Sequence, residues 1–134
     1  MSRLGGQLSG ILVDIGIFRD RRVSFSEALM MWLEGEGFSN AEIGRLLGRD
    51  GRTVWTILDR GHKKVDRLKI EEVGVVVGTG IFRNRRFSIL EAMVMYLVDS
   101  MGIGYREIGR LLGRSEKTVW TVYRRVLEKK SRGR

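Results

Sequence analysis

Two segments of this chain carry arginine and threonine side chains in nearly the same order. Residues 42–56 read EIGRLLGRDGRTVWT and residues 107–121 read EIGRLLGRSEKTVWT. A guanidinium group can donate paired hydrogen bonds to a phosphate or to the edge of a guanine base, and a threonine hydroxyl can contact either group. Because no nucleophile–base pair or carboxylate pair recurs in the chain, these residue types favour binding and predict no enzyme.

The apolar residues of the first segment predict a short helix, a turn and a second helix. Ile43, Leu46 and Leu47 fall on one helical face, at spacings of three and four residues. Gly48 is expected to end that helix because glycine adopts a left-handed backbone without a clash. Asp50 is a good cap for the next helix. The second segment repeats the pattern with Ile108, Leu111, Leu112, Gly113 and Ser115.

The second helix of each segment is expected to cross the first one closely. Gly44 has no side chain at the crossing, and Val54 and Ile57 face inward from the second helix. This packing is typical of a helix-turn-helix. The equivalent residues in the other segment are Gly109, Val119 and Val122.

Residues 42–56 resemble the three-helix DNA-binding units of bacterial repressors and the C-terminal promoter-reading domain of sigma factors. The stretch Arg-Thr-Val-Trp-Thr is similar to a segment common among small microbial DNA-binding proteins. The resemblance covers about half of each repeat, and it implies a helix-turn-helix fold and double-stranded DNA as the partner. The tryptophan is a difference, since many relatives carry a polar base-reading residue there.

We expect the DNA contacts to lie near the start of each second helix or on its outward face. A helix in the major groove presents such side chains to base edges and phosphates. An ordinary exposed polar surface is the alternative. The candidates are Arg49, Arg52, Thr53, Trp55, Thr56 and Arg60 in the first copy and Arg114, Ser115, Lys117, Thr118, Trp120, Thr121, Arg124 and Arg125 in the second.

The two tryptophans among these candidates, Trp55 and Trp120, have two possible roles. Each follows a valine that is expected to be buried, near the edge that faces the groove. We interpret them mainly as core residues that pack against the first helix. Contact with thymine methyl groups or sugars is the alternative.

Two arginine-rich turns precede the helices, and we call residues 19–22 and 83–86 the basic corners. They are candidates for contacts with the phosphate backbone, and a solvated turn is the alternative reading. Their arginines are Arg19, Arg21 and Arg22 in the first corner and Arg83, Arg85 and Arg86 in the second.

The rest of the chain repeats in the same order, which predicts two units over residues 1–66 and 67–134. The β-branched residues of 11–18 and 75–82 predict short strands that could pair with each other across a pseudo-twofold axis. A capping box at Ser24, with its twin at Ser88, predicts a first helix in each unit, and Ser39 begins another box. Gly61 is expected to end the first recognition helix, before a charged linker over residues 61–72.

The composition favours a polyanionic partner. The net charge is +9, with 19 arginines and 6 lysines. Solvated surface or the ion pairing of thermophilic proteins is the alternative explanation. Residues 1–66 hold 10 basic and 9 acidic residues, whereas residues 67–134 hold 15 and 7. Because these counts give +1 and +8, we expect the second unit to anchor the protein on its partner and the first to add reach or selectivity. A structural role for the first unit is the alternative.

Several other classes of protein are disfavoured. There is no cysteine, and the single histidine, His62, has no other typical metal ligand at a suitable spacing in the sequence. We therefore expect no metal or cofactor. No apolar run reaches the about 18 residues of a membrane span, and the start lacks the apolar core of a signal peptide. We therefore expect a cytoplasmic, nucleoid-associated protein without a membrane partner.

Together these patterns predict a mainly α protein of two tandem helix-turn-helix units, each preceded by a short strand. The expected function is double-stranded DNA binding, in a transcriptional regulator whose covalent tandem mimics a repressor dimer with two non-identical half-sites. A homo-oligomer on DNA is left open. The alternatives are an architectural protein that coats DNA with little sequence preference, and a protein-interaction module.

Overall fold

Six α-helices and two short strands follow one another in the computed structural model, which describes residues 10–133. The predicted mainly helical architecture is confirmed. We call residues up to 66 the first half of the chain and residues from 67 the second half. The first half contains β1 (Leu12–Asp14), a 3-10 turn η2 (Ile15–Arg19), α1 (Phe25–Gly35), α2 (Asn40–Leu47) and α3 (Gly51–Lys64). The second half contains β2 (Val76–Gly78), η3 (Thr79–Phe82), α4 (Ile89–Asp99), α5 (Tyr105–Leu112) and α6 (Glu116–Arg132).

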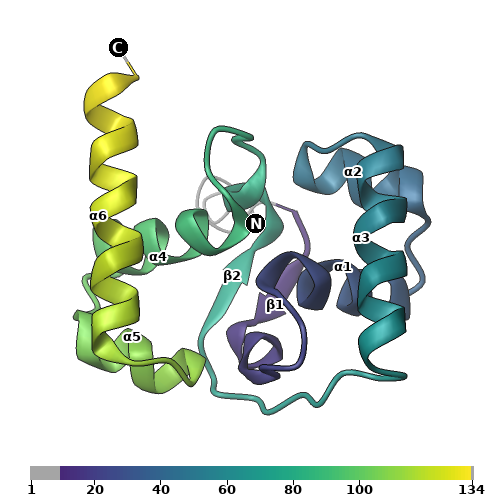
Figure 1. Cartoon of the computed structure of the whole chain (residues 1–134), viewed down its shortest axis with the longest axis horizontal. Coiled ribbons are helices and arrows are strands. Elements are labelled where there is room, and N and C mark those ends of the chain that lie inside the picture. Colours follow the sequence, from purple (N-terminus) through teal and green to yellow (C-terminus); the bar gives the residue numbers. More distant parts are fainter. Residues whose placement is uncertain (1–9, 134) are drawn as a thin grey trace.

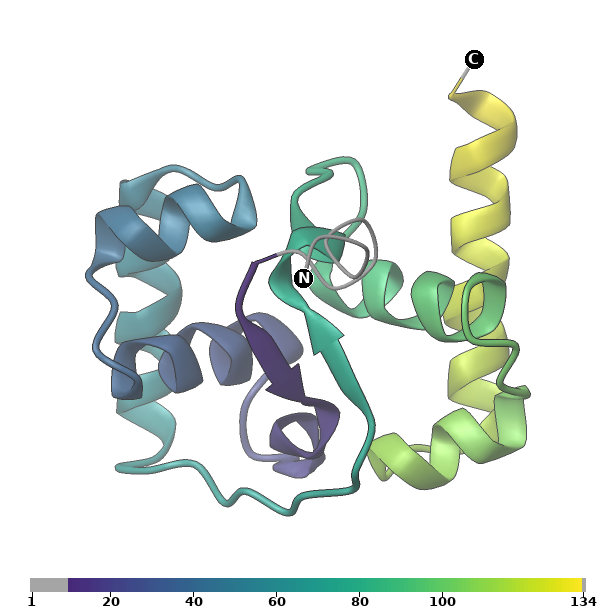
Figure 2. The same cartoon turned by 180° about the vertical axis from the view of Figure 1, so that it is seen from behind.

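The two strands form a small antiparallel sheet in the middle of the molecule, between α1, α2 and α3 on one side and α4, α5 and α6 on the other (Figures 1 and 2). Val13 lies opposite Val77 in the register. Both strands are shorter than predicted because the chain turns into a 3-10 helix after three residues. In the first half, the Asp14 carboxylate starts this turn by accepting a hydrogen bond from the Gly16 N–H at 2.7 Å.

Capping boxes begin three of the helices, as predicted. Ser24, Ser39 and Ser88 each accept a hydrogen bond from the backbone of a glutamate three residues later, and that glutamate binds the serine N–H in return. Each box satisfies two backbone donors that have no partner inside the helix. Local sequence therefore fixes where α1, α2 and α4 begin.

The turns from α2 to α3 and from α5 to α6 have the predicted geometry. Gly48 and Gly113 take left-handed conformations, with φ of 69° and 67°. Asp50 caps α3 and Ser115 caps α6. A Cβ on Gly44 would lie 2.5 Å from the Arg49 carbonyl oxygen, so the close crossing requires a glycine there.

Gly61 does not end α3, and this prediction was wrong. The helix continues to Lys64, and Gly61 is buried within it. A Cβ on Gly61 would lie 2.6 Å from the Met31 sulfur. This glycine therefore allows α1 to approach α3 closely, and His62 lies inside the helix instead of beyond its end.

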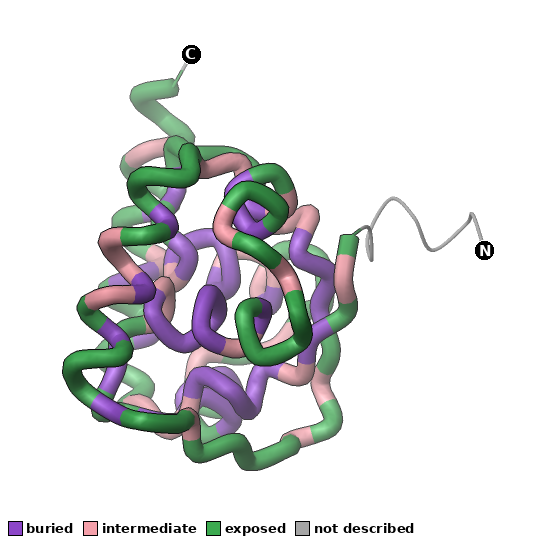
Figure 3. Tube along the Cα trace, turned by 90° about the vertical axis from the view of Figure 1, so that its right-hand side faces the viewer, coloured by how far each residue is buried: buried purple, intermediate pink, exposed green. Residues whose placement is uncertain are grey.

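One hydrophobic core extends through both halves, and Figure 3 shows the buried trace in the interior with exposed segments around it. Leu47 and Leu112 are fully buried, as their helical spacing predicted. The halves also interlock, because η2 packs against α5 and η3 packs against α2. Each 3-10 turn thus supports the second helix of the opposite half.

The segment between α3 and β2 lies against the first half and is held there by two aspartates. Asp20 accepts a hydrogen bond from the Lys69 N–H at 3.0 Å. Asp14 accepts bonds from the Val73 N–H at 3.0 Å and the Gly74 N–H at 2.9 Å. The connection between α3 and β2 is therefore fixed to the first half at three backbone positions.

Candidate nucleic-acid interface

The last helix of each half, α3 or α6, lies on the same face of the molecule. Both helices are in front in Figure 1 and behind the other helices in Figure 2. They run in opposite directions, since α3 descends towards the linker and α6 rises towards the C-terminus in Figure 1. The two segments singled out in the sequence therefore present their second helices to one common surface.

Most of the polar candidates on these helices are exposed. Arg52, Thr53 and Arg60 are exposed on α3, and Thr56 is half-buried. The Thr56 hydroxyl donates to the Arg52 carbonyl oxygen at 3.1 Å. The exposed candidates of α6 are Ser115, Lys117, Thr118, Trp120, Thr121, Arg124 and Arg125.

The interpretation of the two tryptophans as core residues was wrong. Trp55 is 59% exposed and Trp120 is 45% exposed. Val54, Leu58 and Gly61 form the buried face of α3, so a residue one position after Val54 is turned about 100° away from that face. Large aromatic side chains thus occupy corresponding positions on the outward faces of both helices.

The outward faces of α3 and α6 differ in charge. The Arg124 guanidinium lies 5.3 Å from the centre of the Trp120 ring, a cation–π arrangement. The corresponding position beside Trp55 holds Asp59, which pairs with Lys63 at 3.0 Å. One aromatic side chain is therefore bordered by a cation and the other by an anion.

Arg49 is directed into the protein. Its Nη1 donates to the Leu47 carbonyl oxygen at 2.7 Å and to the Phe82 carbonyl oxygen at 2.9 Å, and its Nη2 donates to the Phe87 carbonyl oxygen at 3.2 Å. Burial, followed by the charge of Arg85, lowers the pKa of this guanidinium. Arg49 therefore joins the end of α2 to the opposite half, although we had expected it to contact DNA.

Arg114 occupies the corresponding place in the second half. Its Nη1 donates to the Leu112 carbonyl oxygen at 2.9 Å, and its guanidinium lies 5.0 Å from the centre of the Phe25 ring. Burial, and then the charges of Arg21 and Arg19, lower its pKa. Both arginines at the starts of the outward helices thus contribute to the contact between the halves.

Each basic corner binds the end of a helix from the opposite half. Arg19 donates to the carbonyl oxygens of Arg110 at 2.6 Å and Leu111 at 3.1 Å, at the end of α5. Arg83 donates to the carbonyl oxygen of Arg45, near the end of α2. A positive charge at a helix C-terminus satisfies free carbonyl groups and favours the helix dipole.

The other corner arginines differ in how far they are engaged within the protein. Arg22 forms two hydrogen bonds with the buried Asp20, at 2.9 and 2.7 Å. Arg21 reaches the Gly113 carbonyl oxygen only at 3.5 Å. Arg85 and Arg86 are exposed, and Arg86 lies 5.4 Å from the centre of the Phe87 ring. Arg19, Arg22 and Arg83 therefore have protein partners that would compete with a phosphate.

A hollow of about 650 Å³ lies at the start of α3, and the sequence did not single it out. Four arginines line it: Arg45, Arg49, Arg83 and Arg85. Arg45 belongs to α2 and was missed because it precedes the turn. The signal that could have found it is its recurrence as Arg110 in the second segment.

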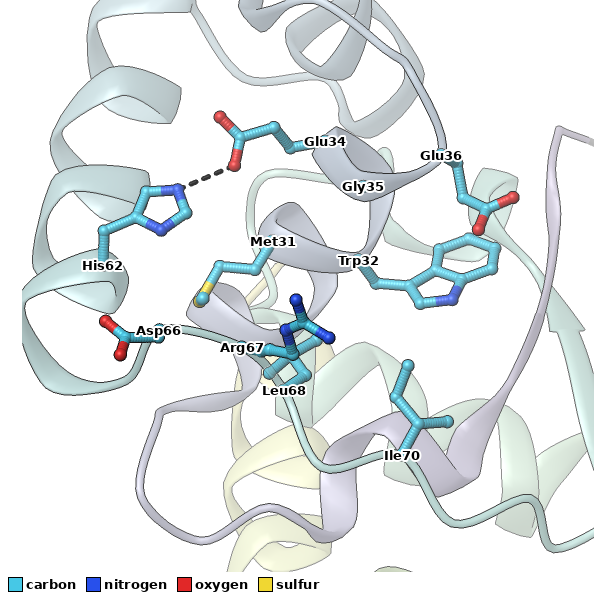
Figure 4. A pocket seen from close by; sticks show the side chains of 10 residues that line it. All are labelled: Met31, Trp32, Glu34, Gly35, Glu36, His62, Asp66, Arg67, Leu68 and Ile70. Carbon is cyan, nitrogen blue, oxygen red and sulfur yellow. Dashed lines mark hydrogen bonds and ion pairs between the residues drawn. The ribbon is translucent and has the colours of Figure 1, made fainter.

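A different groove, of about 530 Å³, lies between α1, the end of α3 and the linker (Figure 4). In it, His62 Nε2 lies 2.7 Å from the Glu34 carboxylate. Met31, Trp32 and Ile70 make much of its wall apolar. Within residues 10–133, no group of histidine and carboxylate side chains is arranged to hold a metal ion.

Comparison of the chain with protein-family models, with curated proteins and with solved structures gave no match. Among the helices of the described part, none is long and apolar enough to cross a membrane.

Proposed function

We propose that this protein binds double-stranded DNA and that α3 and α6 are its two recognition helices, each the second helix of a helix-turn-helix. The observation that carries the proposal is the recurrence of exposed residues on two helices of one face. Thr53 and Trp55 are exposed on α3, and Thr118 and Trp120 are exposed at the corresponding places on α6. A net charge of +9 supports a polyanionic partner.

The opposite directions of α3 and α6 bear on the form of the target. Two recognition helices that run antiparallel on one face suit inverted half-sites, as in dimeric helix-turn-helix proteins. The shared residues Thr, Trp and Thr on both helices would read the same bases in each half-site. Positions where the helices differ, such as Asp59 against Arg124, would make the two half-sites unequal.

A regulator with sequence preference is favoured over an architectural protein by the side chains on these faces. Threonine hydroxyls and tryptophan rings can contact base edges and thymine methyl groups, whereas backbone binding alone needs only cations. The exposed tryptophans also suit a protein partner, and that interaction module is the second candidate function.

The test is a titration of labelled duplex DNA at several salt concentrations, followed by selection from randomised duplexes. We expect the logarithm of the binding constant to fall linearly with the logarithm of salt, by about 0.9 for each phosphate contacted. Selection should enrich an imperfect inverted repeat. A flat salt response would exclude DNA as the partner, and steep salt dependence without enrichment would favour the architectural role.

A further inference from the structure

The two halves exchange basic side chains at the starts of their recognition helices. We propose that the hollow at the start of α3 is a binding site for one phosphate of the DNA backbone, composed of Arg45 from the first half and Arg85 from the second. The inference rests on the proposed function, because the phosphate is that of the duplex that α3 reads.

The position of the hollow supports this assignment. Its wall combines the end of α2, the turn with Gly48 and Asp50, and the second basic corner. Gly48 lets the corner approach, since a Cβ there would lie 2.6 Å from the Arg83 carbonyl oxygen. The hollow is therefore formed only when both halves are together, directly beside the first turn of the recognition helix.

The charges around the hollow are unbalanced. Arg49 and Arg83 use their donors on backbone carbonyl groups, which leave their positive charge uncompensated. Arg45 and Arg85 are exposed, and within residues 10–133 their side chains form no hydrogen bond or close ion pair. Glu42 lies one turn from Arg45 on α2, and its pKa is lowered by hydrogen bonds with Ser39 and then by the charge of Arg45. The one carboxylate in the wall, Asp50, already accepts a hydrogen bond from the Thr53 N–H at 2.8 Å.

Guanidinium groups that line one hollow favour an anion there, because an anion reduces their mutual repulsion. The charge of Arg85 already acts on Arg49 across the boundary between the halves. A phosphate offers several acceptor oxygens and suits the paired donors of arginine. The free donors of Arg45 and Arg85 could therefore bind a single phosphate from two sides.

The equivalent place at the start of α6 differs in that arginines there form close ion pairs. Arg110 there pairs with Glu107, and Arg19 pairs with Glu71 at 2.6 Å. The first half has a sequence charge of only +1, but its recognition helix gains the arginines of the second corner. The net charge of a half, counted from its sequence, therefore differs from the charge around its recognition helix in the folded protein.

The experiment measures whether Arg45 and Arg85 act on the same phosphate. Duplex affinity and its salt dependence are determined for Arg45→Gln, Arg85→Gln and the double variant. Each single variant should lose several-fold in affinity and lower the salt slope by about 0.9, the value for one phosphate. The double variant should lose little more than either single one, because a shared contact can be lost only once.

Two further variants are the controls. Arg85→Gln combined with Arg21→Gln removes corresponding arginines at two different helix starts, so these losses should multiply. Arg67→Gln removes one exposed charge from the groove at the end of α3, outside the hollow, and should change affinity little. Thermal melts of all variants check folding.

The outcomes separate this inference from the proposed function. A wild-type protein without salt-dependent duplex binding would overturn both. Salt-dependent wild-type binding together with multiplying losses from Arg45→Gln and Arg85→Gln, or losses no larger than that of Arg67→Gln, would overturn the shared site alone. Stabilisation against heat by pyrophosphate that requires Arg45, with unchanged duplex affinity of both variants, would assign the hollow to a small anion and also overturn it.

Discussion

The Glu27 carboxylate joins the start of α1 to the end of α3, with the Lys64 Nζ at 2.8 Å from one oxygen and 3.0 Å from the other. The oxygen at 2.8 Å also accepts the Ser24 N–H of the capping box. Glu91 does the same for α4 and α6, with the Lys129 Nζ at 2.6 Å. One buried carboxylate in each half therefore both caps a helix and fixes the last helix of that half, α3 or α6, against it.

Replacing this carboxylate should destabilise the protein. In Glu27→Gln the amide oxygen can still serve the capping box, but the attraction to Lys64 is lost. We expect the free energy of unfolding to fall by about 1–2 kcal/mol in chemical denaturation, less than for a fully buried pair because Lys64 remains half exposed. Glu42→Gln is the matched control, since Glu42 caps α2 with a similar box but has no lysine partner. Equal changes in both variants would contradict this role for Lys64.

Low pH should reduce the stability of the protein through carboxyl groups such as that of Glu27. Burial acts to raise the pKa of Glu27, but Lys64 and the Ser24 backbone hold it below its usual range. Asp20 has its pKa depressed further, chiefly by its hydrogen bonds with Arg22. A carboxyl group with a lowered folded-state pKa stabilises the protein fully above its unfolded pKa of about 4, and that stabilisation is lost as pH falls towards the folded value.

We therefore expect the melting temperature to decline below about pH 4. Asp20→Asn should lower the melting temperature at neutral pH and make the acid decline shallower, because one of the titrating groups is absent. The measurement is a series of thermal melts from neutral to acidic pH. A decline of unchanged steepness in Asp20→Asn would show that Asp20 does not contribute to the pH dependence.

Trp55→Ala and Trp120→Ala should separate stability from DNA affinity. Both side chains are largely exposed, so we expect unfolding free energies within about 0.5 kcal/mol of the wild type. If the rings contact thymine methyl groups or sugars, duplex affinity should fall by about tenfold in anisotropy titrations. Trp32→Ala is the control, because the half-buried Trp32 packs on the core and should affect stability instead. Unchanged affinity in both outward variants would remove the tryptophans from the interface.

If DNA binds as proposed, α3 and α6 should differ in how far charge reversal weakens binding. On α6, Lys117 and Arg124 are both exposed cations, whereas α3 places Asp59 beside Arg60. A negative charge near phosphate opposes binding, so reversal of Lys117 and Arg124 should weaken binding more than reversal of Arg52 and Arg60. Titration of one duplex with both double variants decides between them. Equal losses would indicate equal engagement, and a larger loss from the α3 pair would reverse the order.

Local features of this fold could be predicted because they depend on a few neighbouring residues. Ser24, Gly48 and Asp50 each act within one turn of the chain, and each has the predicted role. The prediction that Gly61 ends α3 was wrong because a glycine is equally typical of a helix end and of a close helix crossing. The choice between the two depends on Met31, which is 30 residues away in sequence.

The candidate site was harder to predict than the helices. Helical spacing correctly predicted that Leu47 is buried. It did not predict how wide the buried face of α3 is, so Trp55 was wrongly assigned to the core. The partners of Arg49 and Arg19 lie in the opposite half, and no local pattern indicates such contacts. Their roles became visible only from the way in which the two halves interlock.

The segment between α3 and β2 is hydrogen-bonded to the first half, and the two halves also contact each other directly. Asp14 and Asp20 accept hydrogen bonds from the backbone of this segment. Arginines of each half donate hydrogen bonds to backbone carbonyl groups of the other half. If the protein binds DNA as proposed, two helices held at one separation suit one half-site spacing, and adjustment to another spacing would have to come from the duplex. Flexible steps such as TA and CA between the half-sites would then favour binding even without contact by a side chain.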